Sequence, residues 1–569
     1  MSATSKASPA TMVDGTEMMS NLSEMARWVK LSGTPEEREA FGFLERRMRE
    51  YGYRTNLLLH DAYISLPGKA QVHVGGTSIG CITHSFSRPT PQGGLSGVPV
   101  YVGAGTAQDF AKVDVRGRIA LIEGMAMPET AKRASDAGAS AQLHISHHEH
   151  IHEMCISPIW GSPSLSTRTD IPKTVACTGA NADGVAMRDA LAVGKFPVVA
   201  LHAEVDTGWR KTPLLECDLD GQDGANTPFV LMSGHYDTWY YGVMDNGSAN
   251  AGMLEAARIV AQRRSELKRG VRVCFWSGHS HGRYSGSTWY VDTHWDELDR
   301  RCVAHVNVDS LGGIGATSLE NAAAMTELMH LAREAVQAHT NQTYKGKRKA
   351  RNSDESFVGV GIPSMFGSIS EQAHKDGPAR NALGWWWHTA EDLIDKVDEA
   401  NLVRDARVLT QVLWRLAADE IVPLDHAATL EALGGEFAEI QDRLKGRFEI
   451  DSLIGIAKSA HSIARSIGAF RGTASKQAVD VANAALMATS RALVPVDYST
   501  GDRFAHEPAL PVPNWTALQP LRDLAATASG SDEEKFATVD AIRARNRIVF
   551  ALREATSALE RARAALGVR

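Results

Sequence analysis

The spacing of apolar residues divides the chain into four stretches. Residues 18–52 carry two segments with helical spacing, and the second has Thr34 and Pro35 as a helix start and Gly52 as a stop. Residues 65–215 contain short apolar runs between glycines and prolines, which predict a mostly β lobe. Residues 228–420 alternate continuous apolar runs with helical segments, and the chain after Pro423 has helical spacing throughout.

These patterns predict an α/β protein with a mostly parallel sheet flanked by helices, because continuous apolar strands separated by helices are typical of sheets covered on both faces. A chain of 569 residues is also too long for one hydrophobic core. We therefore expect a disordered N-terminus at 1–15, an α/β domain from 16–64 and 216–424, an inserted β-rich lobe at 65–215, and a C-terminal helical domain at 425–569.

The amino-acid composition excludes some classes of binding partner. The net charge is −7 and no Lys/Arg cluster stands out, which argues against nucleic acid or an anionic membrane as the main partner. No apolar run approaches 18 residues, and the N-terminus lacks the apolar core of a secretory signal. Six cysteines without CxxC spacing indicate reduced thiols, so we expect a cytoplasmic protein.

Candidate metal ligands follow the predicted strands. In open parallel sheets, ligands bind beyond the carboxyl ends of the strands. His235, Asp237 and Asp245 follow the first strand of the alternating region, Asp309 follows the third, and His388 precedes the closing helix. Each residue alone is more typical of a cap or turn, but together they form a ligand set for zinc or a similar divalent ion. Asp237 is also placed to hold the second ring nitrogen of His235.

The second strand ends in "FWSGHSHGRYSGSTWYVD", which raises a separate question. His279, Ser280 and His281 are either part of a metal and proton-transfer site or a polar loop. Because residues alternate faces in an extended segment, His279 and His281 would point the same way.

Five motifs together carry a family resemblance: "GHYDTWYYGVMDNGSANAGMLEAARIV", "VRVCFWSG…GSTWYVD", "NVDS", "SDESFVGVGIPSMF" and "WWHTAEDLIDKVD". In order and interval they resemble the motifs of M28 family zinc aminopeptidases and carboxypeptidases. The 65–215 lobe resembles the protease-associated domain of the larger members. The 425–569 helices resemble the dimerisation domain of the glutamate carboxypeptidase and transferrin-receptor branch.

The resemblance implies a metal-dependent hydrolase with one or two divalent ions, most simply zinc, with manganese, cobalt and iron as alternatives. Asp245 would bridge the ions, His235 and Asp309 would complete one site, and His388 would belong to the other. The family has two adjacent glutamates, a general base and a metal ligand, where this chain has His279 and Ser280. His279 would then replace the base, and His281 would replace the missing ligand.

Three interpretations follow. The first is an active hydrolase that cleaves an amide or peptide bond of a small or non-standard substrate. The second is an ordinary M28-type aminopeptidase or carboxypeptidase with altered metal preference. The third is a catalytically inactive relative that keeps the fold for binding or dimerisation. Retention of the ligand residues argues against the third, and the resemblance implies a homodimer in each case.

Residues for substrate binding are less distinct. Trp239 and Trp387 flank the first and last ligands and predict an aromatic wall, although core aromatics are an equal alternative. Arg283, Tyr284 and Arg351 are placed to bind a carboxylate or polarise a carbonyl. The histidine-rich segment 144–154 is either a metal site or, as we favour, a polar loop or the rim of a cleft, because it lacks ligand spacing.

Overall fold

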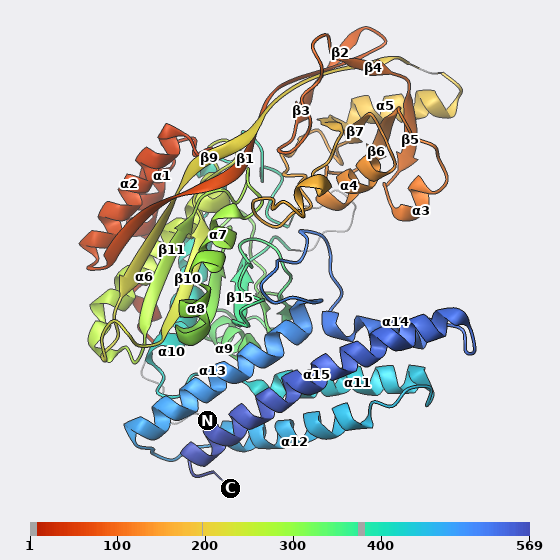
Figure 1. The fold of residues 1–569 in the computed structure, drawn as a ribbon. Coiled ribbons are helices and arrows are strands. Elements are labelled where there is room, and N and C mark those ends of the chain that lie inside the picture. Colours follow the sequence, from red (N-terminus) through yellow and green to blue (C-terminus); the bar gives the residue numbers. More distant parts are fainter. Residues whose placement is uncertain (1–7, 196, 374–381, 569) are drawn as a thin grey trace.

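The computed structural model describes residues 8–195, 197–373 and 382–568. These form three parts: an α/β body, a second α/β lobe, and a helical domain that packs against the body at the opposite end from the lobe (Figure 1). Predicted disorder at the N-terminus does not extend over residues 8–15, because Pro9–Met12 form a 3-10 helix and α1 begins at Gly15. Residues 1–7 lie outside the described residues.

The body is built on a 10-stranded mixed sheet. Its centre is parallel, with β10 pairing with both β11 and β12, and β12 pairing with β15. The flank is antiparallel, so the expectation of a mostly parallel sheet is wrong for this part. The strands of this sheet are β1 (Arg54–Val74), β2 (Thr77–Ile79), β4 (Leu95–Gly97), β9 (Val199–Leu219), β10 (Phe229–His235), β11 (Gly270–Trp276), β12 (Cys302–Val308), β13 (Ala323–Ala324), β14 (Lys347–Arg348) and β15 (Ser364–Gly367).

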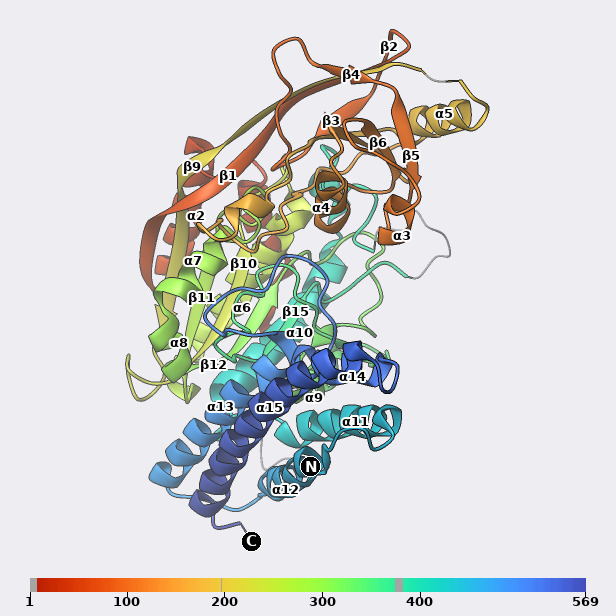
Figure 2. The same ribbon diagram turned by 45° about the vertical axis from the view of Figure 1, so that its right-hand side comes forward.

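Strands β1 and β9 explain the antiparallel flank. They pair along nearly their whole length as a long ribbon that runs out of the body into the lobe (Figure 2). The chain leaves the body along β1 and returns along β9, so the two strands must run in opposite directions. The predicted domain boundaries at residues 65 and 215 therefore fall inside two continuous strands.

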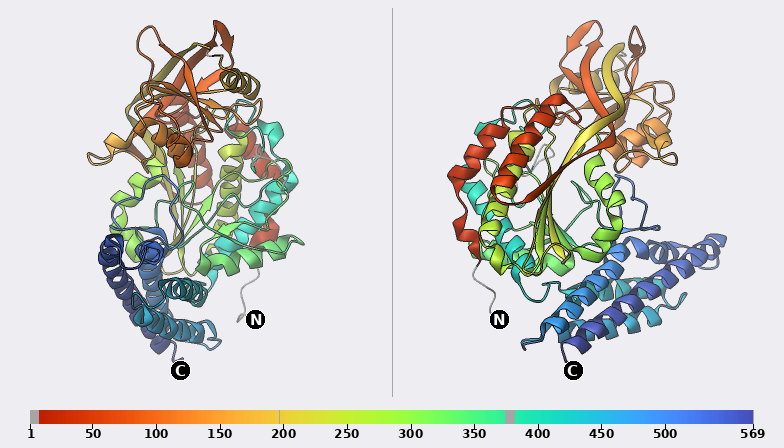
Figure 3. Two further views of the ribbon diagram at one scale, coloured as in Figure 1. Left: turned by 90° about the vertical axis from the view of Figure 1, so that its right-hand side faces the viewer. Right: turned by 60° about the vertical axis from the view of Figure 1, so that its left-hand side comes forward.

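Helices cover both faces of the central sheet, as the continuous apolar strands predicted. β10, β11 and β12 are buried along their full length. The helices of the body, seen on either side of the sheet in Figure 3, are α1 (Gly15–Met25), α2 (Pro35–Glu50), α6 (Ala249–Gln262), α7 (Ser285–Thr293), α8 (Trp295–Arg301), α9 (Met329–His339) and α10 (Glu399–Ala418). The predicted start of α2 is confirmed, since Thr34 Oγ1 accepts from the Glu37 N–H at 3.3 Å.

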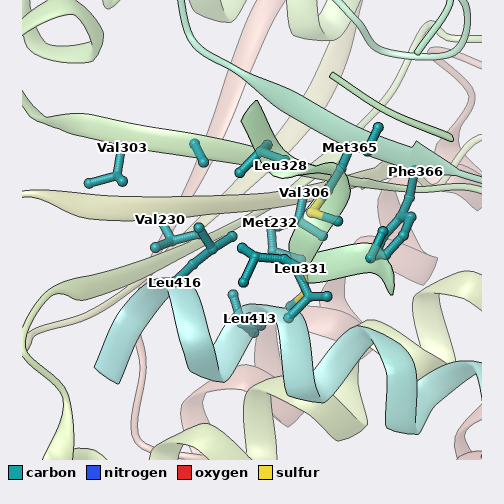
Figure 4. Close-up of a cluster of buried hydrophobic side chains, with 14 of the residues drawn as sticks. Val230, Met232, Val303, Val306, Leu328, Leu331, Met365, Phe366, Leu413 and Leu416 are labelled. Atoms are coloured by element: carbon teal, nitrogen blue, oxygen red, sulfur yellow. The ribbon is translucent and has the colours of Figure 1, made fainter. Parts of the chain in front are cut away.

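Alternate residues of the strands face the two helical layers. Figure 4 shows Val230 and Met232 of β10 packing with Leu413 and Leu416 of α10 in the larger core. Their neighbour Leu231 belongs to a second core on the opposite face, under α7 and α8. Full burial of one such leucine contributes about 2 kcal/mol, so this two-sided packing fixes the strand register and hence where each strand ends.

The lobe has its own five-stranded sheet, parallel except for its first strand. Among the described residues of the lobe, three strands and two helices lie where the sequence pattern had predicted none. Its strands are β3 (Cys81–Thr83), β5 (Pro99–Gly103), β6 (Ile119–Glu123), β7 (Ala141–Ile145) and β8 (Val175–Gly179), and its helices are α3 (Ala107–Phe110), α4 (Pro128–Asp136) and α5 (Asn181–Ala192).

The C-terminal part is helical, as predicted. Its helices are α11 (His426–Leu444), α12 (Asp451–Gly468), α13 (Lys476–Tyr498), α14 (Gln519–Ala526) and α15 (Asp532–Ala565). The segment between α13 and α14 runs back toward the lobe (Figure 1). Among the helices of the described residues, none combines the length and apolar character needed to cross a membrane.

Candidate metal centre

Two histidines and two aspartates from four separate segments of the chain lie close together. His235 ends β10, Asp309 follows β12, and Asp245 lies in the turn that enters α6. His235 Nε2 is 3.2 Å from Asp245 Oδ1 and 3.4 Å from Asp309 Oδ1. His388 Nε2 is 3.1 Å from Asp245 Oδ2. Asp245 therefore contacts the two imidazoles through different oxygens.

The two imidazoles point their Nε2 atoms at these carboxylates. His235 Nδ1 donates to the Asp237 carbonyl at 2.8 Å, and His388 Nδ1 donates to the Glu153 carbonyl at 2.7 Å. Because a carbonyl can only accept, both Nδ1 atoms carry a ring hydrogen, and in the neutral imidazoles both Nε2 lone pairs face carboxylate oxygens. That arrangement repels unless positive charge, a proton or a metal ion, lies between the groups, so the residues fit a divalent metal ion.

The carboxylates also change the pKa of the His235 ring, which they face. Burial lowers the pKa of His235, but Asp245 and Asp309 outweigh it and raise that pKa well above its usual value. For His388 the balance is reversed, because burial dominates and its pKa is lowered. The His235 side, with two carboxylates, is thus the more favourable position for positive charge.

His279 lies beside His235 and is held by a buried aspartate. His279 Nδ1 is 2.9 Å from Asp354 Oδ2, and the rings of His279 and His235 stack at 3.7 Å with an angle of 13°. In the described part of the chain, one group of metal-ligand-type side chains lies close together: His235, His279 and Asp309. One ligand atom from each of these residues lies within 4.8 Å of the other two. However, the in-plane lone pairs of nearly parallel rings do not converge on one point. The geometry favours a proton-accepting role for His279 Nε2 over coordination of the ion that His235 faces.

His281 is separate from this group. Its Nδ1 is 3.2 Å from Ser32 Oγ, which itself donates to Asp237 Oδ2 at 2.8 Å. Its ring packs on Trp239 at 4.3 Å, and its buried Nε2 has no hydrogen-bond partner. Burial lowers the pKa of His281 to about 4. The structure thus does not bring His281 into the ligand group, because the loop turns between His279 and His281 instead of staying extended.

Gly278 permits a sharp turn just before His279. It has a φ of +74°, and a Cβ there would lie 2.0 Å from Ser285 Oγ. Only glycine fits at this point without displacing the start of α7. The sharp turn directly after β11 is what sends His279 toward His235.

Asp237 acts through a different atom from the one predicted. Its carbonyl, not its carboxylate, accepts from His235, and the nearer carboxylate oxygen is 3.9 Å from that nitrogen. The carboxylate instead accepts the backbone N–H groups of His279 at 3.2 Å and Ser280 at 2.9 Å. Asp237 therefore fixes both the tautomer of His235 and the position of the loop that carries His279.

Three residues of the site were missed in the sequence: Asp354, Asp392 and Glu153. Asp392 accepts from the N–H groups of Met244 and Asp245 at 2.9 and 3.0 Å, which fixes the bridging aspartate. Burial raises the pKa of Asp392 to about 7 and that of Glu153 to about 8. Asp354 and Asp392 stand inside recognised motifs, which was the available signal. Glu153 contributes a backbone atom from another lobe, for which the sequence holds no signal.

The predicted aromatic residues surround the centre. Trp387 stacks on His388 at 3.4 Å, Trp239 lies 5.4 Å from the same ring, and Tyr284 meets His279 edge-on at 4.9 Å. All three rings border the centre, and Trp239 and Tyr284 are buried, as the alternative of core aromatics predicts.

The predicted arginines are engaged elsewhere. Arg351 stacks on Trp160 at 4.3 Å and donates to the carbonyls of Glu507 and Pro508 at 3.0 and 3.1 Å. Arg283 lies over Tyr284 at 4.9 Å. Arg351 thus joins the body to the segment before α14, and we correct its assignment from substrate binding to domain packing.

The fold and this site define an α/β protein with a candidate metal centre at the carboxyl ends of its parallel strands. Residues 217–413 match the model of peptidase family M28, so this part of the chain is similar to that family. The matched region contains the four converging residues and His279.

Curated proteins of similar sequence carry peptidase names. The chain is 24% identical over 352 residues to a probable glutamate carboxypeptidase, VP8, from Zea mays, an alignment that covers 50% of this chain and 49% of the maize protein. It is 24% identical over 437 residues to aminopeptidase YwaD from Bacillus subtilis (strain 168), covering 74% of this chain and 88% of that protein. The chain thus aligns with only about half the length of the maize relative.

Solved structures share the fold. An aminopeptidase from Aneurinibacillus sp. strain AM-1 has a TM-score of 0.55 at 18% identity, covering 72% of this chain and 95% of its own. A zinc aminopeptidase from Bacillus subtilis has a TM-score of 0.54 at 21% identity, and the match covers 72% of this chain and 96% of the aminopeptidase.

Proposed function

We propose that this protein is a metal-dependent hydrolase that cleaves an amide or peptide bond. The observation that carries the proposal is the pair of Nε2 lone pairs, on His235 and His388, that face the shared carboxylate of Asp245. The aminopeptidase and carboxypeptidase names of the relatives support a peptide bond as the target. Zinc is the proposed ion, supported by the zinc aminopeptidase of the same fold.

A bound divalent ion supplies polarisation of a carbonyl and a water that ionises near neutral pH. The protein supplies the proton acceptor, His279 Nε2, which is bare because Asp354 holds the hydrogen on Nδ1. Tyr284 packs against His279, and Trp387 packs against His388. Each aromatic ring excludes bulk water from one side of its histidine. General-base catalysis of this kind contributes about 10²- to 10⁴-fold in rate.

We infer that the substrate is a small or short peptide or amide. The departure at His279 and Ser280 from the glutamate pair supports a substrate unlike those of ordinary M28 peptidases. The two other interpretations, an ordinary aminopeptidase or carboxypeptidase with altered metal preference and an inactive relative, are decided by the experiment below.

We further propose a homodimer in the cytoplasm, with the lobe as a protease-associated domain. The dimer is supported by the exposed Phe536, Val539 and Phe550 on α15, which are 74%, 47% and 68% exposed. A reducing location is supported by the six free cysteines.

The test is elemental analysis of the purified protein, followed by hydrolysis of a panel of dipeptides, N-acyl amino acids and amino-acid amides. The apoprotein is reloaded separately with zinc, manganese, cobalt or iron. We expect bound divalent metal and hydrolysis that returns on reloading. Binding without hydrolysis of any panel member favours the inactive relative, and absence of any bound ion contradicts the proposal.

A further inference from the structure

The histidine-rich segment of the lobe lies against the loop that carries His388. His388 and Glu153 are joined by two reciprocal bonds: His388 Nδ1 donates to the Glu153 carbonyl at 2.7 Å, and the Glu153 N–H donates to the His388 carbonyl at 3.0 Å. One residue earlier on each side, His152 Nδ1 bonds to the Trp387 carbonyl. His150 stacks on Trp385 at 4.1 Å.

The hydrogens along this segment have one consistent arrangement. His152 Nδ1 faces a carbonyl and so carries the ring hydrogen, which leaves His152 Nε2 as an acceptor. His148 Nδ1 accepts from the His150 N–H at 3.1 Å, so its own hydrogen is on Nε2 and is donated to His152 Nε2 at 3.2 Å. Every ring nitrogen of His148 and His152 is therefore used, and the chain of bonds ends on the residue before His388.

We propose that His152, supported by His148, is a positioning residue for the metal centre: it docks the lobe onto the Trp387–His388 peptide and thereby fixes the orientation of the His388 imidazole. The inference rests on the proposed metal centre and extends it to a second part of the chain. It also assigns a role to histidines that show no ligand spacing and, in the described residues, join no metal-type group.

Two consequences follow from the physics of the contact. Outer partners that orient a metal-ligating histidine typically change metal affinity by about 10- to 100-fold when removed. Because coupling between two binding events is reciprocal, an ion held by His388 must also stabilise docking of the lobe segment.

The experiment measures metal affinity rather than activity. Zinc affinity is determined by competition with a chromophoric chelator, and coordination is followed by the visible absorption spectrum of the cobalt-loaded protein. His152→Ala is expected to weaken affinity about 10-fold or more and to change the cobalt spectrum. His152→Asn keeps an N–H donor toward the Trp387 carbonyl and is expected to restore most of the loss.

His147→Ala is the matched control, because His147 is an exposed member of the same segment. Its affinity and spectrum should equal those of the wild type. Thermal unfolding of each variant separates misfolding from loss of positioning. If His152→Ala does not fold, His148→Ala replaces it, since that change removes the bonds of His148 to His150 and His152 but leaves the His152–Trp387 bond in place, and a several-fold weaker affinity is then expected.

Hydrogen exchange provides an independent readout. In the wild type, adding zinc is expected to slow exchange of the backbone amides of residues 146–154. The inference would be overturned if His152→Ala, or His148→Ala where that replaces it, had the metal affinity and cobalt spectrum of the wild type. Unchanged hydrogen exchange on adding zinc would also overturn it. Either result would leave the proposed function intact. Failure of the wild type to bind any ion would instead contradict the proposed function.

Discussion

Four imidazoles near the centre each have Nδ1 held by a different acceptor. These acceptors are the carbonyls of Asp237 and Glu153, the carboxylate of Asp354 and the hydroxyl of Ser32. Each bond places a ring hydrogen on Nδ1. The Nε2 atoms differ in their surroundings: those of His235 and His388 face carboxylates, whereas the buried Nε2 of His281 has no hydrogen-bond partner.

Asp354 is expected to control the proton acceptor. Asp354→Asn keeps the shape of the side chain but removes the charge that stabilises a protonated His279. Burial raises the pKa of the Asp354 carboxyl, but His279 outweighs this and lowers it, so the carboxylate is ionised. We expect kcat to fall about 100-fold with bound metal unchanged, measured by steady-state kinetics and elemental analysis. An equal loss of metal would instead place His279 among the ligands.

Ser280 is expected to limit the second ion. On the His388 side the described residues show only His388 and Asp245 in contact, and the buried Ser280 Oγ has no partner. The family resemblance implies a carboxylate ligand at this position. Ser280→Glu is therefore expected to raise the number of tightly bound ions from one to two per chain, measured by isothermal titration with zinc. Ser280→Ala is the control and should leave the titration unchanged.

Individual elements are joined by buried ionisable groups as well as by apolar packing. Glu327 stands in a 3-10 helix of the body (Thr326–Leu328) that packs against α11 of the helical domain. Its Oε2 accepts from the Thr429 hydroxyl at 3.3 Å, and burial raises its pKa to about 7. The contact between the two domains therefore depends on a carboxyl group that is protonated below neutral pH.

The free energy of unfolding should fall as the pH rises from the pKa of this carboxyl in the unfolded chain to its pKa in the folded protein. Between the ordinary pKa of a glutamate, about 4.5, and about 7, the folded protein retains a proton that the unfolded chain has lost. The free energy of unfolding is then expected to decrease by about 3 kcal/mol across that window and to level off above it. Glu327→Gln should lose this dependence, measured by urea unfolding at pH 5 and pH 8. Glu431→Gln, an exposed change on α11, is the control and should behave as the wild type.

Three parts of the whole molecule meet around the metal centre. The lobe contributes Glu153 and Trp160, the latter donating to Ser356 Oγ at 2.9 Å. The helical domain contributes the segment before α14, where the Ala509 N–H bonds to the Pro158 carbonyl at 2.8 Å. Trp160 and Ala509 both pack against Tyr284, which meets the His279 ring, while the ligand-type side chains themselves come from the body.

The exposed face of α15 is expected to form the dimer. Phe536→Glu combined with Phe550→Glu places charge on the two most exposed apolar side chains of that helix. Because burying unpaired charge is costly, the double variant should run as a monomer, measured by light scattering coupled to size exclusion. Glu439→Ala on the exposed side of α11 should remain dimeric. A monomeric wild type would refute the proposed homodimer.

The sequence by itself determined the elements of the body and the residues at its strand ends. Continuous apolar runs identify β10, β11 and β12 because strands buried on both faces admit few polar side chains, and the order of the strands brings His235, Asp309 and their partners to one edge. Only the tertiary structure decided the roles of His281, Arg351 and the histidine-rich segment. Their partners come from elsewhere in the chain, often as backbone carbonyls, which every residue possesses and no sequence pattern marks.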